Sequence, residues 1–305
     1  MIERPRIVFM GTPTFAVASL KALIDAQFNV VGVVTAPDKP AGRGMQLQQS
    51  AVKVFAQSQN IPVLQPEKLK APQFFEQLSA LQPDLQVVVA FRILPESIWS
   101  MPPMGTLNVH GSLLPQYRGA APINWAIING EKETGVTTFL LQHAIDTGDM
   151  LLQEKIPVTP NMTAGELHDI MMEVGANTLV KTVHQLIDNK ITPQPQPILD
   201  TLHHAPKIFT KDCEINWNDT AQNIHNKIRG LAPFPGAITK IDGKVVKLYL
   251  TQFEKDVPKE TPGTFIIDNN IAKIACQDGY ILLKDIQWEG KKRMPIEDFL
   301  RGYRK

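Results

Sequence analysis

The chain has 305 residues, 43% of them hydrophobic and 20% charged, and a net charge of +1. This length can bury one large core and is usually enough for two domains, while two cysteines, Cys213 and Cys276, exclude a disulfide framework and have no metal-ligand spacing. No apolar run is long enough to span a membrane and no signal-peptide pattern is visible, so we expect a cytoplasmic protein with buried thiols, no metal and no membrane partner.

The charge is unevenly divided along the chain. A Pro-rich segment at residues 191–198 has the composition of a linker. Residues 206–305 contain 17 Lys and Arg against 13 Asp and Glu, so this part carries +4 and the remainder −3. A modest basic excess is usually a solvated surface, and by itself it indicates a polyanionic partner only weakly.

The first part of the chain alternates short β-branched runs with helix-like segments, the rhythm of βαβ units. Strands are predicted at residues 7–10, 30–34, 62–64, 86–90 and 106–109, and helices at 14–26, 51–57 and 72–81. We therefore predict an α/β domain over residues 1–190 with a doubly wound, mostly parallel sheet. Ligands of such sheets bind beyond the carboxyl ends of the strands, where loops open at Gly11, Thr35, Ala90, Val109 and Leu141.

Two glycine-containing loops are candidates for phosphate sites. Gly11-Thr-Pro-Thr-Phe15 follows the first predicted strand, but it lacks the second and third glycines of a dinucleotide fingerprint. Binding of NAD is therefore not supported, and a tight turn is the simpler interpretation. The later Gly42-Arg-Gly44 lies in a polar loop with no helix-opening glycine after it.

Polar side chains cluster where the strand at residues 106–109 ends. Asn108 and His110 occupy alternate positions, so they point to the same face, and an amide with an imidazole could hold an oxyanion. Asp146, in a second polar loop at residues 141–149, could orient or charge the imidazole. This trio is chemically sufficient for acyl transfer. The residue types alone leave open a structural histidine and a turn-capping aspartate.

The remainder of the chain reads as a smaller β domain. After a linker at residues 191–205, a helix is predicted at 220–229 and strands at 245–250, 263–267, 271–275 and 280–283. These elements over residues 206–305 predict a small barrel, for which the oligonucleotide-binding (OB) type is a plausible form. Its basic residues are predicted to line one face, and they are Lys207, Lys211, Lys227, Arg229, Lys291, Lys292 and Arg293.

Several motifs together resemble the methionyl-tRNA formyltransferases, within the wider group of folate-dependent formyltransferases. The most specific are Pro37-Asp-Lys-Pro-Ala-Gly-Arg-Gly44, His110-Gly-Ser-Leu-Leu-Pro115, Tyr117-Arg-Gly-Ala-Ala-Pro122, Asp146-Thr-Gly-Asp149, Ile228-Arg-Gly-Leu231 through Pro235-Gly-Ala237, Lys291-Lys-Arg-Met294 and Asp298-Phe-Leu-Arg-Gly302. The resemblance runs nearly from end to end. Two departures are Phe91-Arg92 where the family usually has Tyr-Gly, and Met45-Gln46 where it often has a Lys pair.

The resemblance implies roles for individual residues. Asn108, His110 and Asp146 would be the catalytic trio. The folate, 10-formyltetrahydrofolate, would be received by Ser112, Leu113, Leu114 and Pro115 together with the backbone of Phe91, Arg92, Ile93 and Leu94. The tRNA would be contacted by Lys39, Arg43, Lys207, Lys291, Lys292 and Arg293.

The expected reaction is transfer of the formyl group of 10-formyltetrahydrofolate to the amino group of methionyl-initiator tRNA, releasing tetrahydrofolate without a metal. Three other functions are alternatives to this reaction. The same trio would serve a transferase acting on glycinamide ribotide or an amino sugar nucleotide, or a hydrolase releasing formate. A non-enzymatic RNA-binding protein is the alternative of a different class, and a retained polar trio argues against it.

Overall fold

The computed structural model describes residues 4–41, 46–268 and 270–303. Its contacts divide the chain into two compact units. The amino-terminal unit comprises residues 1–118, 135–156 and 169–203, and the carboxyl-terminal unit comprises residues 119–134, 157–168 and 204–305. Within the described residues, no helix has the length and apolarity to cross a membrane.

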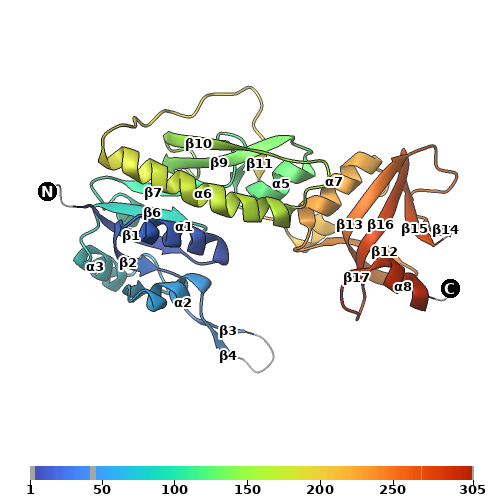
Figure 1. Ribbon diagram of the computed structural model, residues 1–305, viewed down its shortest axis with the longest axis horizontal. Coiled ribbons are helices and arrows are strands. Elements are labelled where there is room, and N and C mark those ends of the chain that lie inside the picture. Colours follow the sequence, from blue (N-terminus) through green and yellow to red (C-terminus); the bar gives the residue numbers. More distant parts are fainter. Residues whose placement is uncertain (1–3, 42–45, 269, 304–305) are drawn as a thin grey trace. The chain divides into compact units, whose positions relative to one another are not determined.

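The amino-terminal unit is built on a seven-stranded sheet in the order β10-β9-β7-β6-β1-β2-β5 (Figure 1). The strands are β1 (Arg6–Gly11), β2 (Asn29–Val34), β5 (Val63–Leu64), β6 (Leu85–Val89), β7 (Thr106–His110), β9 (Glu133–Leu140) and β10 (Met150–Pro157). Strands β5, β2, β1, β6 and β7 run parallel, and β9 pairs antiparallel to β7. The predicted doubly wound, mostly parallel sheet is confirmed.

Helices cover both faces of this sheet because its central strands are apolar on both sides. They are α1 (Thr14–Asp25), α2 (Ala51–Ser58), α3 (Pro72–Ala80), α4 (Glu96–Trp99) and α6 (Ala164–Ile187). Ile7 and Phe9 of β1 pack in one core with residues of α1, α2 and α6. Val8 and Met10 pack in a second core with residues of α3 and α4. The alternation of β1 therefore fixes the sheet between two helical layers.

The polar segment after β2 is partly regular. Strands β3 (Lys39–Ala41) and β4 (Gln46–Gln48) pair antiparallel, where the sequence suggested a loop. The base of this hairpin is held by Asp38, whose carboxylate accepts hydrogen bonds from Lys53 Nζ at 2.5 Å and Gln65 Nε2 at 2.7 Å. These hydrogen bonds lower the pKa of Asp38. The predicted tRNA contact Arg43 lies outside the described residues.

The carboxyl-terminal unit contains an antiparallel sheet in the order β12-β13-β16-β15-β14, with β17 paired to β16. Its strands are β12 (Ala237–Ile241), β13 (Lys244–Lys255), β14 (Phe265–Asp268), β15 (Ile271–Cys276), β16 (Gly279–Trp288) and β17 (Met294–Pro295). Its helices are α5 (Pro122–Ile128), α7 (Ala221–Leu231) and α8 (Ile296–Gly302). The predicted second, β-rich fold is confirmed as an antiparallel sheet domain.

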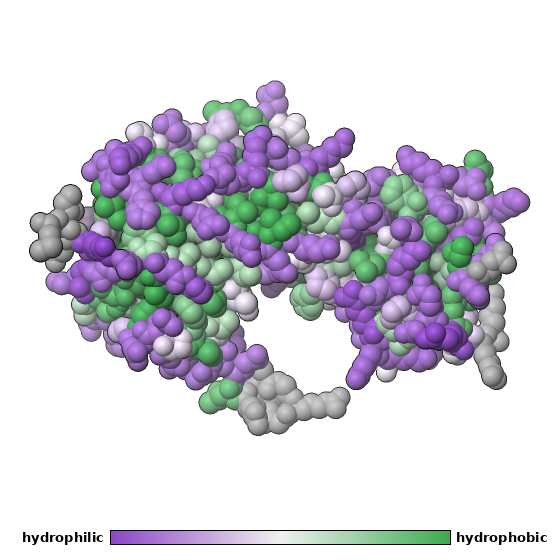
Figure 2. Space-filling model, in the orientation of Figure 1, coloured by the Kyte–Doolittle hydropathy of each residue, from purple (hydrophilic) through white to green (hydrophobic). Residues whose placement is uncertain are grey.

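One core joins α7 to this sheet. Ile224 and Ile228 of α7 are fully buried with Val246 and Leu248 of β13. Both cysteines are buried free thiols, as predicted, and burial raises the pKa of each. On the face seen in Figure 2, hydrophilic side chains cover much of each unit, and hydrophobic groups form separate patches.

Candidate active site

His110 is the last residue of β7, and a backbone oxygen of the following loop holds its imidazole ring. Its side chain is buried, and Nε2 lies 2.9 Å from the backbone oxygen of Tyr117. Because a carbonyl oxygen can only accept, Nε2 carries the hydrogen of this bond. Nδ1 then faces Asp146, with 3.9 Å between Nδ1 and Oδ2. This pair attracts when the imidazole is protonated, and it is too long for a direct hydrogen bond.

Asp146 lies in the loop between β9 and β10. Its backbone has φ of 55°, in the left-handed region that Asp tolerates better than most residues. The loop closes where Leu140 N donates to Asp149 O at 3.0 Å. A Cβ at Gly148 would lie only 1.6 Å from the backbone oxygen of Leu140, so the chain passes itself too closely for any side chain. The close approach at Gly148 therefore restricts the backbone of the loop that carries Asp146.

Asn108 lies on the same face of β7 as His110, as its spacing predicts. It is partly exposed, and within the described part of the chain its amide has no hydrogen-bond partner. Two residues along a strand are separated by roughly 6.6 Å. The structure thus brings His110 and Asp146 together and leaves an amide donor on the same face. The catalytic roles of the three residues stay predictions.

The loop that follows His110 is clamped to the neighbouring strands. Thr137 Oγ1 of β9 donates to Ser112 O at 2.6 Å and accepts from Leu114 N at 3.0 Å. Gln153 Nε2 of β10 donates to Leu114 O at 2.9 Å. The Ser112 hydroxyl itself donates to Gln116 O, so its proton is also used within the loop.

The segment Phe91–Leu94, predicted to receive the folate with its backbone, shows why the Arg92 departure is accommodated. The Arg92 guanidinium turns to the loop after β5, where it donates to Pro66 O at 2.8 Å and Glu67 O at 3.1 Å. Burial lowers the pKa of Arg92. Leu94 is buried in the core, whereas Ile93 is 76% exposed. The side chains of this segment thus support or flank the loop.

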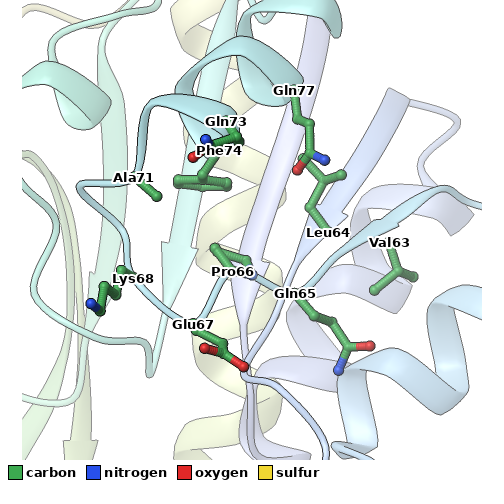
Figure 3. Close-up of a pocket in the computed structure, with 10 residues that line it drawn as sticks. All are labelled: Val63, Leu64, Gln65, Pro66, Glu67, Lys68, Ala71, Gln73, Phe74 and Gln77. Carbon is green, nitrogen blue, oxygen red and sulfur yellow. The ribbon is translucent and has the colours of Figure 1, made fainter.

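A hollow of about 500 Å³ lies between the loop after β5 and α3. Figure 3 shows its lining, from Val63 to Lys68 on one side and from Ala71 to Gln77 on the other. The trio does not line it, and Gln65 of its wall is already bonded to Asp38 and Ala36. Pro66 and Glu67 of its wall accept the hydrogen bonds of Arg92, so the hollow adjoins the candidate folate loop without reaching the trio.

The predicted tRNA contacts differ in how free they are. Lys39, Lys207, Lys291 and Lys292 are exposed. Lys207 Nζ lies 5.6 Å from the ring centre of Phe209, beside a hollow of about 510 Å³ that Phe234 also lines. Arg293 is already paired, with Nη2 2.7 Å from Asp285 Oδ2 and its guanidinium over the ring of Tyr249.

The expectation that Arg229 lines an exposed basic face is wrong. Arg229 is 5% exposed, and its guanidinium donates to Met162 O at 2.9 Å and to Asn226 Oδ1 at 3.0 Å. The segment at residues 157–168 belongs to the same unit and covers this side of α7. Arg229 thus stabilises the unit internally, and sequence spacing gave no sign of this cover.

Sequence reasoning missed one residue of the site, Gln196. The segment at 191–205 was interpreted as a linker, yet Gln196 bonds to the backbone of Asp146 and Gly148 and to the side chain of Arg118. The only signal in the sequence is a glutamine repeated between prolines at 194 and 196. Among the described residues, no group of three His, Cys, Asp or Glu is placed to hold a metal ion.

Comparison with known proteins now identifies the chain. Residues 5–183 match the family described as Formyl transferase, and residues 207–304 match its C-terminal domain. The methionyl-tRNA formyltransferase of Parabacteroides distasonis is 50% identical over 99% of this chain and 97% of its own, and that of Bacteroides fragilis strain ATCC 25285 is 45% identical over 99% and 96%. HypX from Aquifex aeolicus, solved with tetrahydrofolic acid, shares the fold over 98% of this chain and 47% of its own, with a TM-score of 0.66 and 18% identity. The chain belongs to the formyl transferase family and, within it, to the methionyl-tRNA formyltransferases.

Proposed function

We propose that this chain transfers the formyl group of 10-formyltetrahydrofolate to the free amino group of methionyl-initiator tRNA, and that Asn108, His110 and Asp146 carry the reaction. The observation that supports this most is the geometry at the end of β7. A buried imidazole is held between a backbone oxygen at 2.9 Å and a carboxylate at 3.9 Å. An amide without a partner among the described residues lies on the same face.

The folate supplies a formyl carbon attached to its N10. The uncharged methionyl amine forms a new bond to this carbon, and the bond from the carbon to N10 then breaks. One proton leaves the amine nitrogen and one proton reaches N10, so the exchange needs no oxidant or reductant. The formyl oxygen gains negative charge on the way, and this charge is what the protein must stabilise.

Asn108 and His110 are suited to that task. The Asn108 amide donates a neutral hydrogen bond. The imidazole donates from Nδ1, because its Nε2 hydrogen is already directed to Tyr117 O. Each well-placed donor lowers such a barrier by on the order of 3 kcal/mol. Asp146 stabilises the positive imidazole from 3.9 Å and is proposed to relay the amine proton through water.

The folate is proposed to lie along the two loops that follow β6 and β7. Ser112–Pro115 is held rigid by Thr137 and Gln153, and Phe91–Leu94 is buttressed by Arg92. Rigid loops at the carboxyl ends of parallel strands are where such sheets bind ligands. The internal hydrogen bonds of these loops therefore give a folate a fixed surface to bind.

The tRNA is proposed to reach the site along the hairpin of β3 and β4 and over the carboxyl-terminal unit. Lys39 is exposed on β3, and Arg43, which follows it in the sequence, lies outside the described residues. Lys207, Lys291 and Lys292 are exposed cations for phosphates, and Arg293 contributes from its pair with Asp285. Charged initiator tRNA is made and used in the cytoplasm, so we place the reaction there.

Transfer to a small phosphorylated amine is the rival activity. Such a substrate calls for an anion cradle of backbone N–H groups after β1, and Pro13 at the start of α1 supplies none. The decisive test incubates the pure protein with 10-formyltetrahydrofolate and, separately, methionyl initiator tRNA, methionyl elongator tRNA and glycinamide ribotide. Formylation of initiator tRNA alone is expected, and formylation of glycinamide ribotide alone would overturn the proposal.

A further inference from the structure

We propose that Gln196 is a positioning residue for formyl transfer, tying the loop that carries Asp146 to the loop that holds His110. The inference rests on the proposed function and adds to it a residue from the segment interpreted as a linker. The part of that segment at residues 194–203 is called the strap below, and all of it lies in the amino-terminal unit.

The Gln196 amide is fully used in hydrogen bonds. Its Nε2 donates to the backbone oxygen of Asp146 at 2.8 Å and to that of Gly148 at 2.9 Å. Its Oε1 accepts from Arg118 Nη2 at 2.5 Å and from Arg118 Nε at 3.1 Å. Two donors and one oxygen with two lone pairs are the whole capacity of this group. A glutamine here joins two loops that are distant in sequence.

One of these loops holds the partner of His110 Nε2, and the other holds the partner of Nδ1. Arg118 directly follows Tyr117, whose backbone oxygen holds His110 Nε2. Gln196 grips the Asp146 loop by its backbone, at a residue with left-handed φ. The separation of 3.9 Å between His110 Nδ1 and Asp146 Oδ2 is therefore set by loops that share one amide. Loosening that amide changes the separation without removing any group that reacts.

The strap is itself anchored, so Gln196 is presented from a fixed backbone. Near its start, Gln194 and Met150 exchange backbone hydrogen bonds of 2.7 and 2.8 Å. At its end, His203 O accepts from Tyr117 N at 2.6 Å, and Gln116 bonds to the backbone of Thr201 and His203. The strap is thus held on the Met150 side and on the Tyr117 side, and Gln196 completes the connection between them.

The chain offers a matched control two residues away. Gln194 lies in the same Pro-rich sequence, and its side chain reaches only Thr192 O at 3.4 Å. Gln194→Ala removes the same atoms from the strap and keeps the backbone pairing with Met150. We expect kcat within about twofold of the parent for Gln194→Ala. For Gln196→Ala we expect kcat lower by about 10- to 100-fold, because small misplacements of reacting groups cost this much.

Two further variants separate positioning from a general structural role. Gln196→Glu keeps oxygens for Arg118 but has no hydrogens for Asp146 O and Gly148 O, so its loss is expected to equal or exceed that of Gln196→Ala. In an Asp146→Asn background, Gln196→Ala is expected to cost less than about threefold, because the carboxylate it positions is gone. Activity restored by Gln196→Glu, or an undiminished loss in the Asp146→Asn background, would overturn the inference.

All variants are assayed as the full chain with 10-formyltetrahydrofolate and methionyl initiator tRNA, and thermal unfolding is measured for each. Gln196→Ala is expected to unfold at a lower temperature than Gln194→Ala, because it loses four hydrogen bonds, so kcat is compared at a temperature where both proteins are folded. If Gln196→Ala does not fold, Gln196→Met takes its place, since it keeps the length of the side chain. An inactive parent chain would contradict the proposed function, whereas an active parent with an equally active Gln196→Ala or Gln196→Met would contradict only this inference.

Discussion

His110 is the central residue of the candidate site because each of its ring nitrogens faces a defined partner. Nε2 is committed to a backbone oxygen, and Nδ1 faces Asp146. We therefore expect His110→Ala, Asn108→Ala and Asp146→Ala each to lower kcat by on the order of 100-fold or more, as for groups acting in the transition state.

Steady-state kinetics of formyl transfer, with circular dichroism to verify folding, measure this effect. His143→Ala is the control, because His143 is exposed and interacts with Glu96 and Trp99 rather than with the trio. The double variant of Asn108 and His110 should lose far less than the product of the single losses if the groups act as a unit. Normal turnover by a folded His110→Ala protein would contradict the mechanism.

Gly148 gives a second test at the level of one residue. An added methyl group would meet the backbone oxygen of Leu140 at 1.6 Å, so Gly148→Ala must displace the loop that carries Asp146. We expect a lower unfolding midpoint and a loss of kcat in the same variant. Gly302→Ala is the control, since no atom of the described residues lies within 4 Å of its added Cβ. A fully active and equally stable Gly148→Ala protein would show that the loop adapts freely.

Residue patterns predicted part of this site. Asn108 and His110 follow from alternation at the end of a buried strand, and Asp146 from a polar loop between two strands. Gln196 could not be predicted in this way, because its partners are backbone oxygens distant in sequence. Likewise Arg229 looks like any surface cation, and only the cover of α7 by residues 157–168 makes it internal.

At the scale of elements, α7 predicts a pH-dependent stability. His225 is 3% exposed and donates or accepts through Nδ1 at 3.0 Å from Thr251 Oγ1. Burial, with the positive charge of nearby Arg229, lowers the pKa of His225 from 6.5 to about 4. As pH falls below 6.5 the unfolded chain takes up a proton that the folded chain refuses until about pH 4.

The contribution of neutral His225 to the free energy of unfolding should therefore be fully present above about pH 6.5. It should decline by on the order of 2 to 3 kcal/mol as pH falls to about 4. Urea unfolding of the parent and of His225→Gln across this range measures the difference. The variant should be less stable near neutral pH and show a shallower decline in acid. Parallel pH profiles of the two proteins would contradict a neutral buried His225.

The elements themselves were predicted unevenly. Central strands such as β1, β2 and β6 match because they are apolar on both faces and bounded by turn residues. The hairpin of β3 and β4 was not predicted, since its residues are polar and its pairing is local. Strands β13 and β16 extend beyond the predicted runs. Their outer residues include many polar ones and are held in the strands by pairing with each other, which the sequence pattern does not show.

At the scale of the whole molecule, the exposed lysines predict how binding responds to salt. If Lys207, Lys291 and Lys292 contact phosphates, tRNA binding weakens steeply with salt. Removing one contact should reduce the slope of log K against log salt by roughly 0.7 to 0.9. Filter binding of Lys207→Ala across a salt series measures this slope, with Lys21→Ala as control, because Lys21 pairs with Asp25 on α1. An unchanged slope for Lys207→Ala would indicate a solubilising role.

The large-scale organisation was predictable from rhythm and composition, but its details were not. The change from βαβ alternation to a run of short strands indicated two different folds. The division at residues 191–205 is linear, however, and stays a prediction. By contacts, residues 119–134 and 157–168 pack with the carboxyl-terminal sheet, because α5 lies against α7 and residues 157–168 accept the Arg229 donors.

The strap also determines where insertions and deletions can be tolerated in this part of the chain. Between Gln196 and His203 the chain bows into solvent, with Ile198 fully exposed, while both ends stay fastened beside His110 and Asp146. An insertion or deletion close to either fastening would shift the register of the glutamine and disturb the chemistry in the same event. We therefore expect changes in the length of the strap to be tolerated only within that exposed stretch.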